Sequence, residues 1–206
     1  MISRAINAME SAMETRPLNY GAAQVLSEYY IQVSRYDDAR ATLEISTSLN
    51  SPSNPSIILR HFFIALCEND TVAIRERLEA LVVADPAVGA IIREVLANFE
   101  FEHVVIIESL RRLLHESTDM TGDGLVLLAS LAGYYGDPEL ALEAMTQEIE
   151  NGQIRGARLW YPFFSEMRQL PGFKTLVKSM GLVTFWRTYV WADYCSPVDD
   201  DDFECF

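Results

Sequence analysis

The chain lacks most of the features that mark specialised classes of protein. It has only 3 cysteines in 206 residues, and this odd count without close pairing argues against a disulfide scaffold and favours a reducing compartment. The sequence leaves a disulfide between Cys195 and Cys205 undecided, although nothing in the surrounding sequence demands one. No run of about 18 uncharged apolar residues exists, and charges interrupt residues 1–17, so we expect neither a membrane span nor a signal peptide. The sequence therefore predicts a cytoplasmic protein.

Motifs of catalysis and of metal binding are missing as well. The 3 histidines, His61, His103 and His115, form no ligand pair at helical spacing. Gly122 and Gly124 are not followed by the Lys–Ser/Thr of a phosphate-binding loop, and no nucleophile motif occurs. The net charge of −14 repels the phosphate backbone of nucleic acids. The sequence therefore predicts no catalytic residue, no metal, no cofactor and no direct contact with nucleic acid.

What the sequence does contain is an internal repeat. Ala5, Ala39, Ala73 and Ala141 are separated by 34 or 68 residues, and the skipped position is the apolar Ile107. Breaks rich in proline and aspartate recur at the end of each repeat. A period of 34 residues is that of the tetratricopeptide repeat (TPR), in which a small residue early in the second helix allows close packing. Matches to other positions of the TPR pattern are weak except in the first helix pair.

The chain therefore resembles a TPR-like solenoid, an all-α, right-handed α-α superhelix of about four helix pairs over residues 1–158. No strand pattern competes with helices at residues 2–15, 21–34, 36–48, 55–67, 70–83, 87–98, 101–115, 124–135 and 137–150. Residues 2–15 would be the second helix of a repeat whose first helix is absent, which leaves an apolar face open. We expect the chain to be the C-terminal piece of a longer protein, or to pack this face on a partner.

Residues 159–196 change in composition and become rich in aromatic residues and proline. Their ordered pattern is Leu159–Trp160–x–Pro162, Arg168, Pro171–x–Phe173, Gly181–Leu182, Phe185–Trp186 and Asp193–x–Cys195. This pattern resembles the closing segment of TPR-like regions in bacterial signalling proteins, where such regions follow a winged-helix DNA-binding domain or a nucleotide cyclase domain. The large apolar side chains predict a helical cap on the last repeat, built on Trp160, Pro162, Phe173, Gly181 and Trp186.

Residues 197–206 end the chain in a run of carboxylates. The expected state of such a run is a solvated, disordered acidic tail. Alternatively, Phe203 and Phe206 give the tail two apolar anchors for self-inhibition or for docking on a partner.

The family resemblance also implies a binding groove lined by the first helix of each pair. The corresponding residues are mainly apolar in the middle of the groove: Gln24, Glu28, Ile31, Ile58, Phe62, Ile92, Leu96, Phe99 and Tyr134. An exposed apolar groove indicates a partner, a dimer or the chain's own tail as its occupant. Tight curvature that buries these residues within the solenoid is the alternative.

These features predict a non-catalytic module that binds a protein or peptide, with a homodimer as one form of partner, in a bacterial signalling or transcription regulator. In this reading, Phe62→Asp should abolish partner capture without unfolding the chain. The alternative function is a small-molecule sensor with a pocket between the cap and the last repeat, near Tyr134, Trp160 and Trp186.

Overall fold

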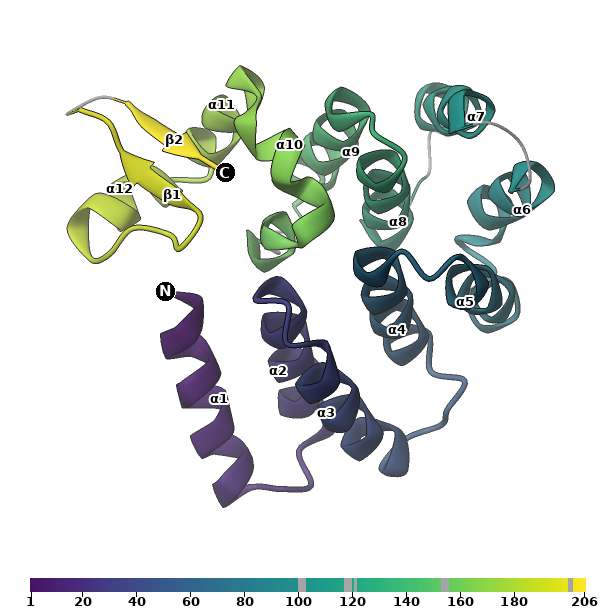
Figure 1. The fold of residues 1–206 in the computed structure, drawn as a ribbon, viewed down its shortest axis with the longest axis horizontal. Helices are drawn as coiled ribbons and strands as arrows, with labels where there is room; N and C mark the ends of the chain where they lie inside the picture. The colour runs from purple at the N-terminus through teal and green to yellow at the C-terminus, as the bar shows by residue number, and fades with distance from the viewer. Residues whose placement is uncertain (100–102, 117–119, 121, 153–155, 200–201) are drawn as a thin grey trace.

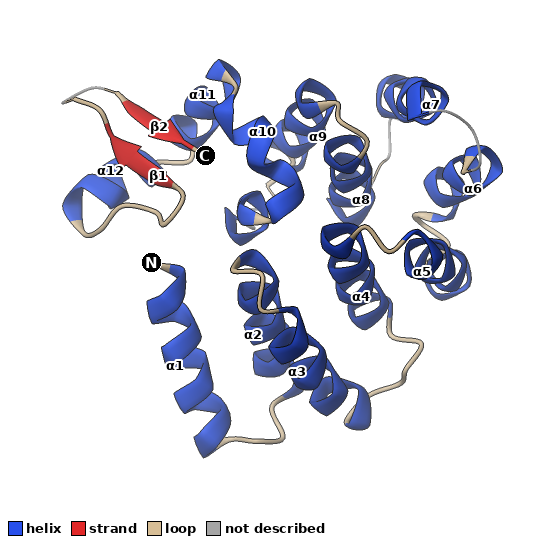
Figure 2. Ribbon diagram, viewed as in Figure 1, coloured by secondary structure: helices blue, strands red, loops and turns tan. Residues whose placement is uncertain are grey.

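The structure, a computed structural model, describes residues 1–99, 103–116, 120, 122–152, 156–199 and 202–206. Within these ranges the chain is mostly helical, which confirms the all-α class (Figures 1 and 2). The helices before the cap are α1 (Ile2–Thr15), α2 (Tyr20–Gln32), α3 (Tyr36–Ser48), α4 (Pro55–Glu68), α5 (Thr71–Ala84), α6 (Gly89–Asn98), α7 (His103–Glu116), α8 (Gly122–Tyr134) and α9 (Pro138–Glu150).

The helix boundaries follow local signals in the sequence. Asn54, Asp70 and Asp137 each accept a hydrogen bond from a backbone N–H in the first turn of the following helix, which satisfies a donor that the helix leaves open. Pro55 and Pro138 occupy the first helical positions, where the missing N–H costs nothing. The expected bounds lie within about two residues of the observed ones, except that the expected start at residue 101 falls outside the described residues.

The helices follow one another around an arch, and the two ends of the arch lie beside each other (Figure 1). Hydrogen bonds join these ends across most of the sequence. The backbone N–H of Ile2 donates to the carboxylate of Asp193, and the hydroxyl of Tyr194 donates to the backbone carbonyl of Gln32. The C-terminal segment therefore holds α1 and α2 as well as the last helices.

The cap begins with two 3-10 turns on the inner side of the arch, η1 (Gly156–Trp160) and η2 (Pro162–Phe164), against α2, α4 and α8. Tyr161 and Phe164 are fully buried, and the ring centroids of Tyr161 and Phe63 are 4.8 Å apart. Gly133 of α8 allows this approach, because a Cβ there would lie 2.6 Å from the carbonyl oxygen of Phe163. The cap thus fills the inside of the arch, and α10 (Ser165–Gln169), α11 (Pro171–Ser179) and α12 (Leu182–Thr188) continue it outward.

The end of the chain differs from the expected disordered tail. It forms two short antiparallel strands, β1 (Cys195–Pro197) and β2 (Phe203–Cys205), where no strand was expected. Cys195 lies directly opposite Cys205, and the two form the disulfide that the sequence left open but did not favour. The aromatic ring of Phe203 is fully buried because the hairpin folds it onto the cap. In the described part of the chain, no helix combines the length and apolarity needed to cross a membrane.

Candidate functional site

The expected apolar groove is not an open surface. None of its four central residues is more than 6% exposed, namely Ile31, Ile58, Phe62 and Ile92. The η1–η2 segment occupies the inner side of the arch, so these side chains belong to the core, and the prediction of an open groove is wrong for them. Phe62→Asp would bury a carboxylate and unfold the protein, contrary to our expectation. The other apolar groove residues are half-buried, so their part in binding stays a prediction: Leu96, Phe99 and Tyr134.

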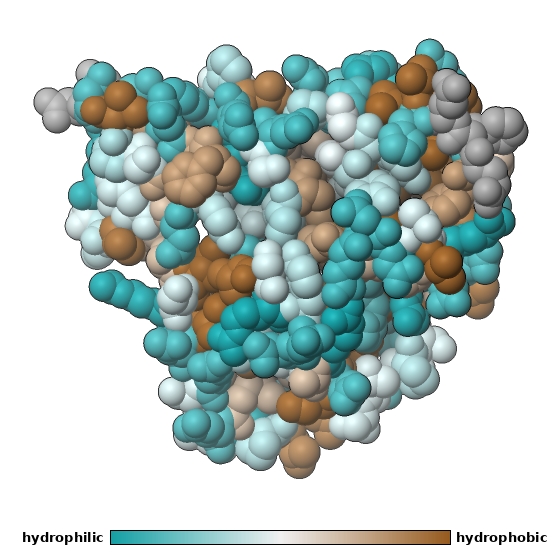
Figure 3. All heavy atoms as spheres, viewed as in Figure 1, coloured by the Kyte–Doolittle hydropathy of each residue, from teal (hydrophilic) through white to brown (hydrophobic). Residues whose placement is uncertain are grey.

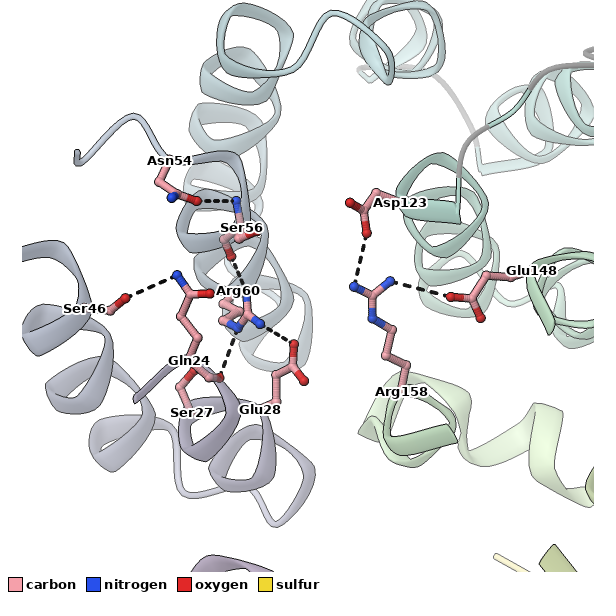
Figure 4. A network of polar contacts seen from close by, with 10 residues as sticks. All are labelled: Gln24, Ser27, Glu28, Ser46, Asn54, Ser56, Arg60, Asp123, Glu148 and Arg158. Atoms are coloured by element: carbon pink, nitrogen blue, oxygen red, sulfur yellow. Dashed lines mark hydrogen bonds and ion pairs between the residues drawn. The ribbon is translucent and has the colours of Figure 1, made fainter. Parts of the chain in front are cut away.

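The two polar groove residues take part in a network that joins α2, α3 and α4 (Figure 4). Arg60 donates to the backbone carbonyl of Gln24 at 3.1 Å and to the carboxylate of Glu28 at 2.6 Å. The amide of Gln24 donates to the hydroxyl of Ser46 at 3.2 Å. The side chains of Arg60 and Glu28 are only 12% and 14% exposed. Gln24 and Glu28 are therefore committed to contacts within the fold.

A second buried arginine anchors the cap to α8 and α9 (Figure 4). Arg158 of η1 lies 3.1 Å from the carboxylate of Asp123 and 3.8 Å from that of Glu148. The side chains of Arg158 and Glu148 are 6% and 1% exposed, so each charge is compensated where water has little access. The cavity between Arg158 and Arg60 measures about 40 Å³. This volume is comparable to that of one water molecule, so the cavity is too small for an organic ligand.

A larger cavity lies where the two ends of the arch meet, and we call it the seam pocket. Its volume is about 300 Å³. On the N-terminal side it is lined by Met1, Ile2, Ala5, Tyr29 and Gln32. On the cap side it is lined chiefly by Trp160, Met180, Leu182, Phe185 and Trp186. Asp193 also lines it, where the cap meets the start of α1. Hydrophobic residues gather in the hollow between α1, α2 and the cap in Figure 3.

The aromatic wall of the seam pocket is supported from behind. Trp160 and Trp186 are 9% and 2% exposed, and their ring centroids are 5.9 Å apart. Phe203 and Trp191 pack against Trp186 at centroid distances of 5.9 and 5.7 Å. Each of these contacts lies within the range of favourable aromatic pairs. The wall is therefore packed against its own neighbours on the side away from the cavity.

Asp193 fixes the start of α1 at the edge of the pocket. Burial alone would raise its pKa, but the hydrogen bonds from the α-amino group of Met1 and the backbone N–H of Ile2 outweigh burial and hold the pKa below its usual value. Its carboxylate compensates the positive end of the α1 dipole. Asp193 is therefore ionised at neutral pH and already has its charge partners within the protein.

Arg168 ties together the other parts of the cap. Its guanidinium donates to the backbone carbonyls of Leu159, Tyr161 and Phe206, at 3.2, 2.9 and 3.0 Å. Burial lowers the pKa of Arg168 to about 10, a value that still leaves the group charged at neutral pH. This one side chain joins η1 and the residue between η1 and η2 to the end of the chain, which accounts physically for an arginine at this position.

The predicted cap residues lie in the cap, but the predicted pocket is displaced. Trp160 and Trp186 line the seam pocket, whereas Tyr134 lies beside a different, shallow hollow next to Pro162. Phe173 is fully buried, and Gly181 has a φ of +73° between α11 and α12, as expected for a helix end. The pocket lies against α1 and α2, not against the last helix pair.

Sequence reasoning missed several residues of the seam pocket, above all Ala5, Tyr29 and Phe185. One signal was present, because the open apolar face expected on residues 2–15 is the face that the cap approaches. What the sequence did not contain was any local indication that the cap would approach this face.

Among the described residues, we find no second site built from other reactive side chains. Burial raises the pKa of the Cys67 thiol to about 12, so it stays protonated at neutral pH. Over the described ranges, no three His, Cys, Asp or Glu side chains gather in a way that could hold a metal ion.

Comparison with models of known protein families finds no match to this chain, and comparison with curated proteins finds no match either. The resemblance to TPR-like regions of bacterial regulators therefore rests on residues of this sequence alone and stays a prediction.

Proposed function

We propose that the chain is a non-catalytic recognition module that binds a small molecule in the seam pocket. The four successive pairs from α2 to α9 would form a right-handed, TPR-like superhelix, and the module would belong to a bacterial signalling or transcription regulator. The repeat is supported by Ala39 and Ala141, which are fully buried at equivalent positions of α3 and α9. Both helices pack closely on the helix before them, as the small residue of the repeat requires.

The observation that carries the proposal is the position of the seam pocket between the two ends of the arch. Its volume of about 300 Å³ is at the lower end of the range for small-molecule sites, and its lining is predominantly apolar with few polar groups. A ligand in this pocket contacts α1, α2 and the cap together. It therefore binds the closed arch better than an open one and shifts the population toward the closed form.

A protein or peptide partner is the second candidate, and an exposed aromatic pair favours it. Phe185 of α12 and Tyr189, directly after α12, are 46% and 72% exposed, with ring centroids 4.8 Å apart. Phe185 also lines the seam pocket, so an apolar side chain of a partner could enter the pocket from this pair. A second copy of the chain is one such partner, and sedimentation of the Tyr189→Asp variant tests it.

The small-molecule proposal is tested by thermal-shift screening of three proteins. Ala5 lines the pocket, whereas Ala8 on the same helix is exposed, so Ala5→Leu and Ala8→Leu form a matched pair. Leucine has nearly the helix propensity of alanine, so both variants should fold. A compound that stabilises the parent protein and Ala8→Leu, but not Ala5→Leu, supports the pocket. The proposal fails if no compound stabilises the parent, or if Ala5→Leu responds equally.

A further inference from the structure

The volume of the seam pocket restricts the size of its ligand. An apolar cavity of about 150 Å³ holds one benzene molecule. The seam pocket, at about 300 Å³, is twice that size. It therefore accommodates roughly two fused rings, or an acyl chain of similar volume.

The lining favours rings over a flexible chain. Aromatic side chains face the cavity from both ends of the arch, Tyr29 from α2 and Trp160, Phe185 and Trp186 from the cap. Aromatic contacts add about 2- to 10-fold in affinity beyond the burial of apolar area. A rigid ligand also loses less conformational entropy on binding than an acyl chain does. Met180 adds a polarisable thioether to the same cavity.

The charges around the pocket disfavour an ionic ligand. Asp193 and the α-amino group of Met1 both line the pocket, but they pair with each other, so neither charge is left for an ionic ligand. The net charge of −14 on the whole chain further disfavours an anion. A cation gains little, because Asp193 already accepts hydrogen bonds from the start of α1. Capturing Asp193 would remove the cap of that helix.

From the volume, the aromatic lining and the charge, we propose that the ligand of the seam pocket is an uncharged aromatic molecule of about two fused rings. This inference rests on the proposed function of the pocket and specifies the chemical class of its ligand. The ring of the ligand lies among Tyr29, Trp160 and Trp186, and Phe185 forms the outer edge.

Calorimetric titration with four probes tests the ligand class. The probes are indole, a linear alkanol of similar volume, indole acetate as the anion and tryptamine as the cation. We expect indole to bind best, the alkanol about 3-fold more weakly and indole acetate at least about 10-fold more weakly. Tryptamine should not bind more tightly than indole. An alkanol, anion or cation that binds more tightly than indole overturns the inference.

Two matched pairs of variants test whether indole binds in the seam pocket. Ala5→Leu should weaken indole binding at least about 10-fold, while Ala8→Leu should leave it unchanged. Phe185→Leu keeps an apolar side chain but removes a ring, so it should weaken indole and spare the alkanol. Tyr189→Leu removes a neighbouring exposed ring outside the pocket and should weaken neither. Because Phe185 is largely exposed, its variant remains informative if Ala5→Leu does not fold.

The outcomes separate the ligand class from the proposed function. If the alkanol or an ion binds best and Ala5→Leu abolishes that binding, the pocket stands and the aromatic class is wrong. If no small molecule binds the parent protein, both fail. If indole binds equally to the parent and Ala5→Leu, its site lies elsewhere and the inference is overturned.

Discussion

Reduction of the Cys195–Cys205 disulfide should destabilise the protein by an amount that follows from its short loop. The two cysteines are 10 residues apart in the sequence. Closing a loop of this length in the unfolded chain reduces its entropy and stabilises the folded state by about 2.7 kcal/mol at 25 °C. For a chain of about 200 residues, each kcal/mol shifts Tm by roughly 2–4 °C. We therefore expect a dithiol reductant to lower Tm by roughly 5–10 °C.

The same reduction should reach the seam pocket through Phe203. The disulfide holds β2 against β1, and the fully buried ring of Phe203 lies between Trp186 and Trp191. Loosening β2 removes this support from Trp186, which lines the pocket. The tryptophan fluorescence of the folded protein should therefore change on reduction, before any global unfolding.

Differential scanning calorimetry with and without the reductant measures the stability change. The control is the double variant Cys195→Ser, Cys205→Ser, whose Tm should be low and insensitive to reductant. Alkylation of the folded protein checks the chemistry, because Cys67, with a pKa of about 12, stays unreactive while the two released thiols are labelled. Equal Tm values for the oxidised and reduced parent protein would refute the reasoning.

Three further predictions concern the packing and charges of the fold. Gly133→Ala should cost about 1–3 kcal/mol in denaturant unfolding, because its Cβ would meet a backbone carbonyl of η2 at 2.6 Å. Gly172→Ala should cost less, since its Cβ meets only the end of a leucine side chain at 2.8 Å, and equal losses would contradict this. Arg158→Met should lower the free energy of unfolding by about 3–5 kcal/mol, because it leaves the buried carboxylate of Glu148 without its ion pair. Arg112→Met breaks an exposed ion pair and should lower the free energy of unfolding by no more than about 1 kcal/mol. Burial and two nearby arginines lower the pKa of His61 from 6.5 in the folded protein. As the pH falls, the imidazole of the unfolded chain is therefore protonated before that of the folded protein. Stability should fall as the pH decreases through about 6.5, and His61→Gln should flatten that dependence.

The helical part of the fold was predictable because its signals are local. Asn54–Pro55 and Asp137–Pro138 carry an N-cap and a first-turn proline next to each other, and α4 and α9 begin there. Each helix boundary is determined by only a few neighbouring residues. The aromatic cap was predictable for a similar reason, because rings such as Trp160 and Phe173 must be buried wherever they lie.

The site was less predictable because it depends on contacts between distant residues. The groove residues Ile31 and Phe62 are positioned as in an open repeat, but the η1–η2 segment, about a hundred residues further along the chain, lies on the inner side of the arch. The sequence left the Cys195–Cys205 disulfide open and did not predict it, because a run of carboxylates between the two cysteines resembles a flexible tail. The signal of a strand in the sequence was the alternation of apolar Phe203, charged Glu204 and apolar Cys205, which are buried, exposed and buried in the structure.

The alanines spaced by 34 or 68 residues lie in different surroundings in the structure, and this difference bears on the cavity at the seam. Ala39 and Ala141 are fully buried because α3 and α9 each pack on the preceding helix at this position. Ala5 has the same place in the repeat, yet it lines the seam pocket and faces the cap. The cap presents broad rings there, held in place by their own neighbours, and these cannot move in to fill the space beside a methyl group. In α1, a small side chain at this spacing therefore leaves space beside the rings of the cap, and a larger side chain there would reduce the pocket.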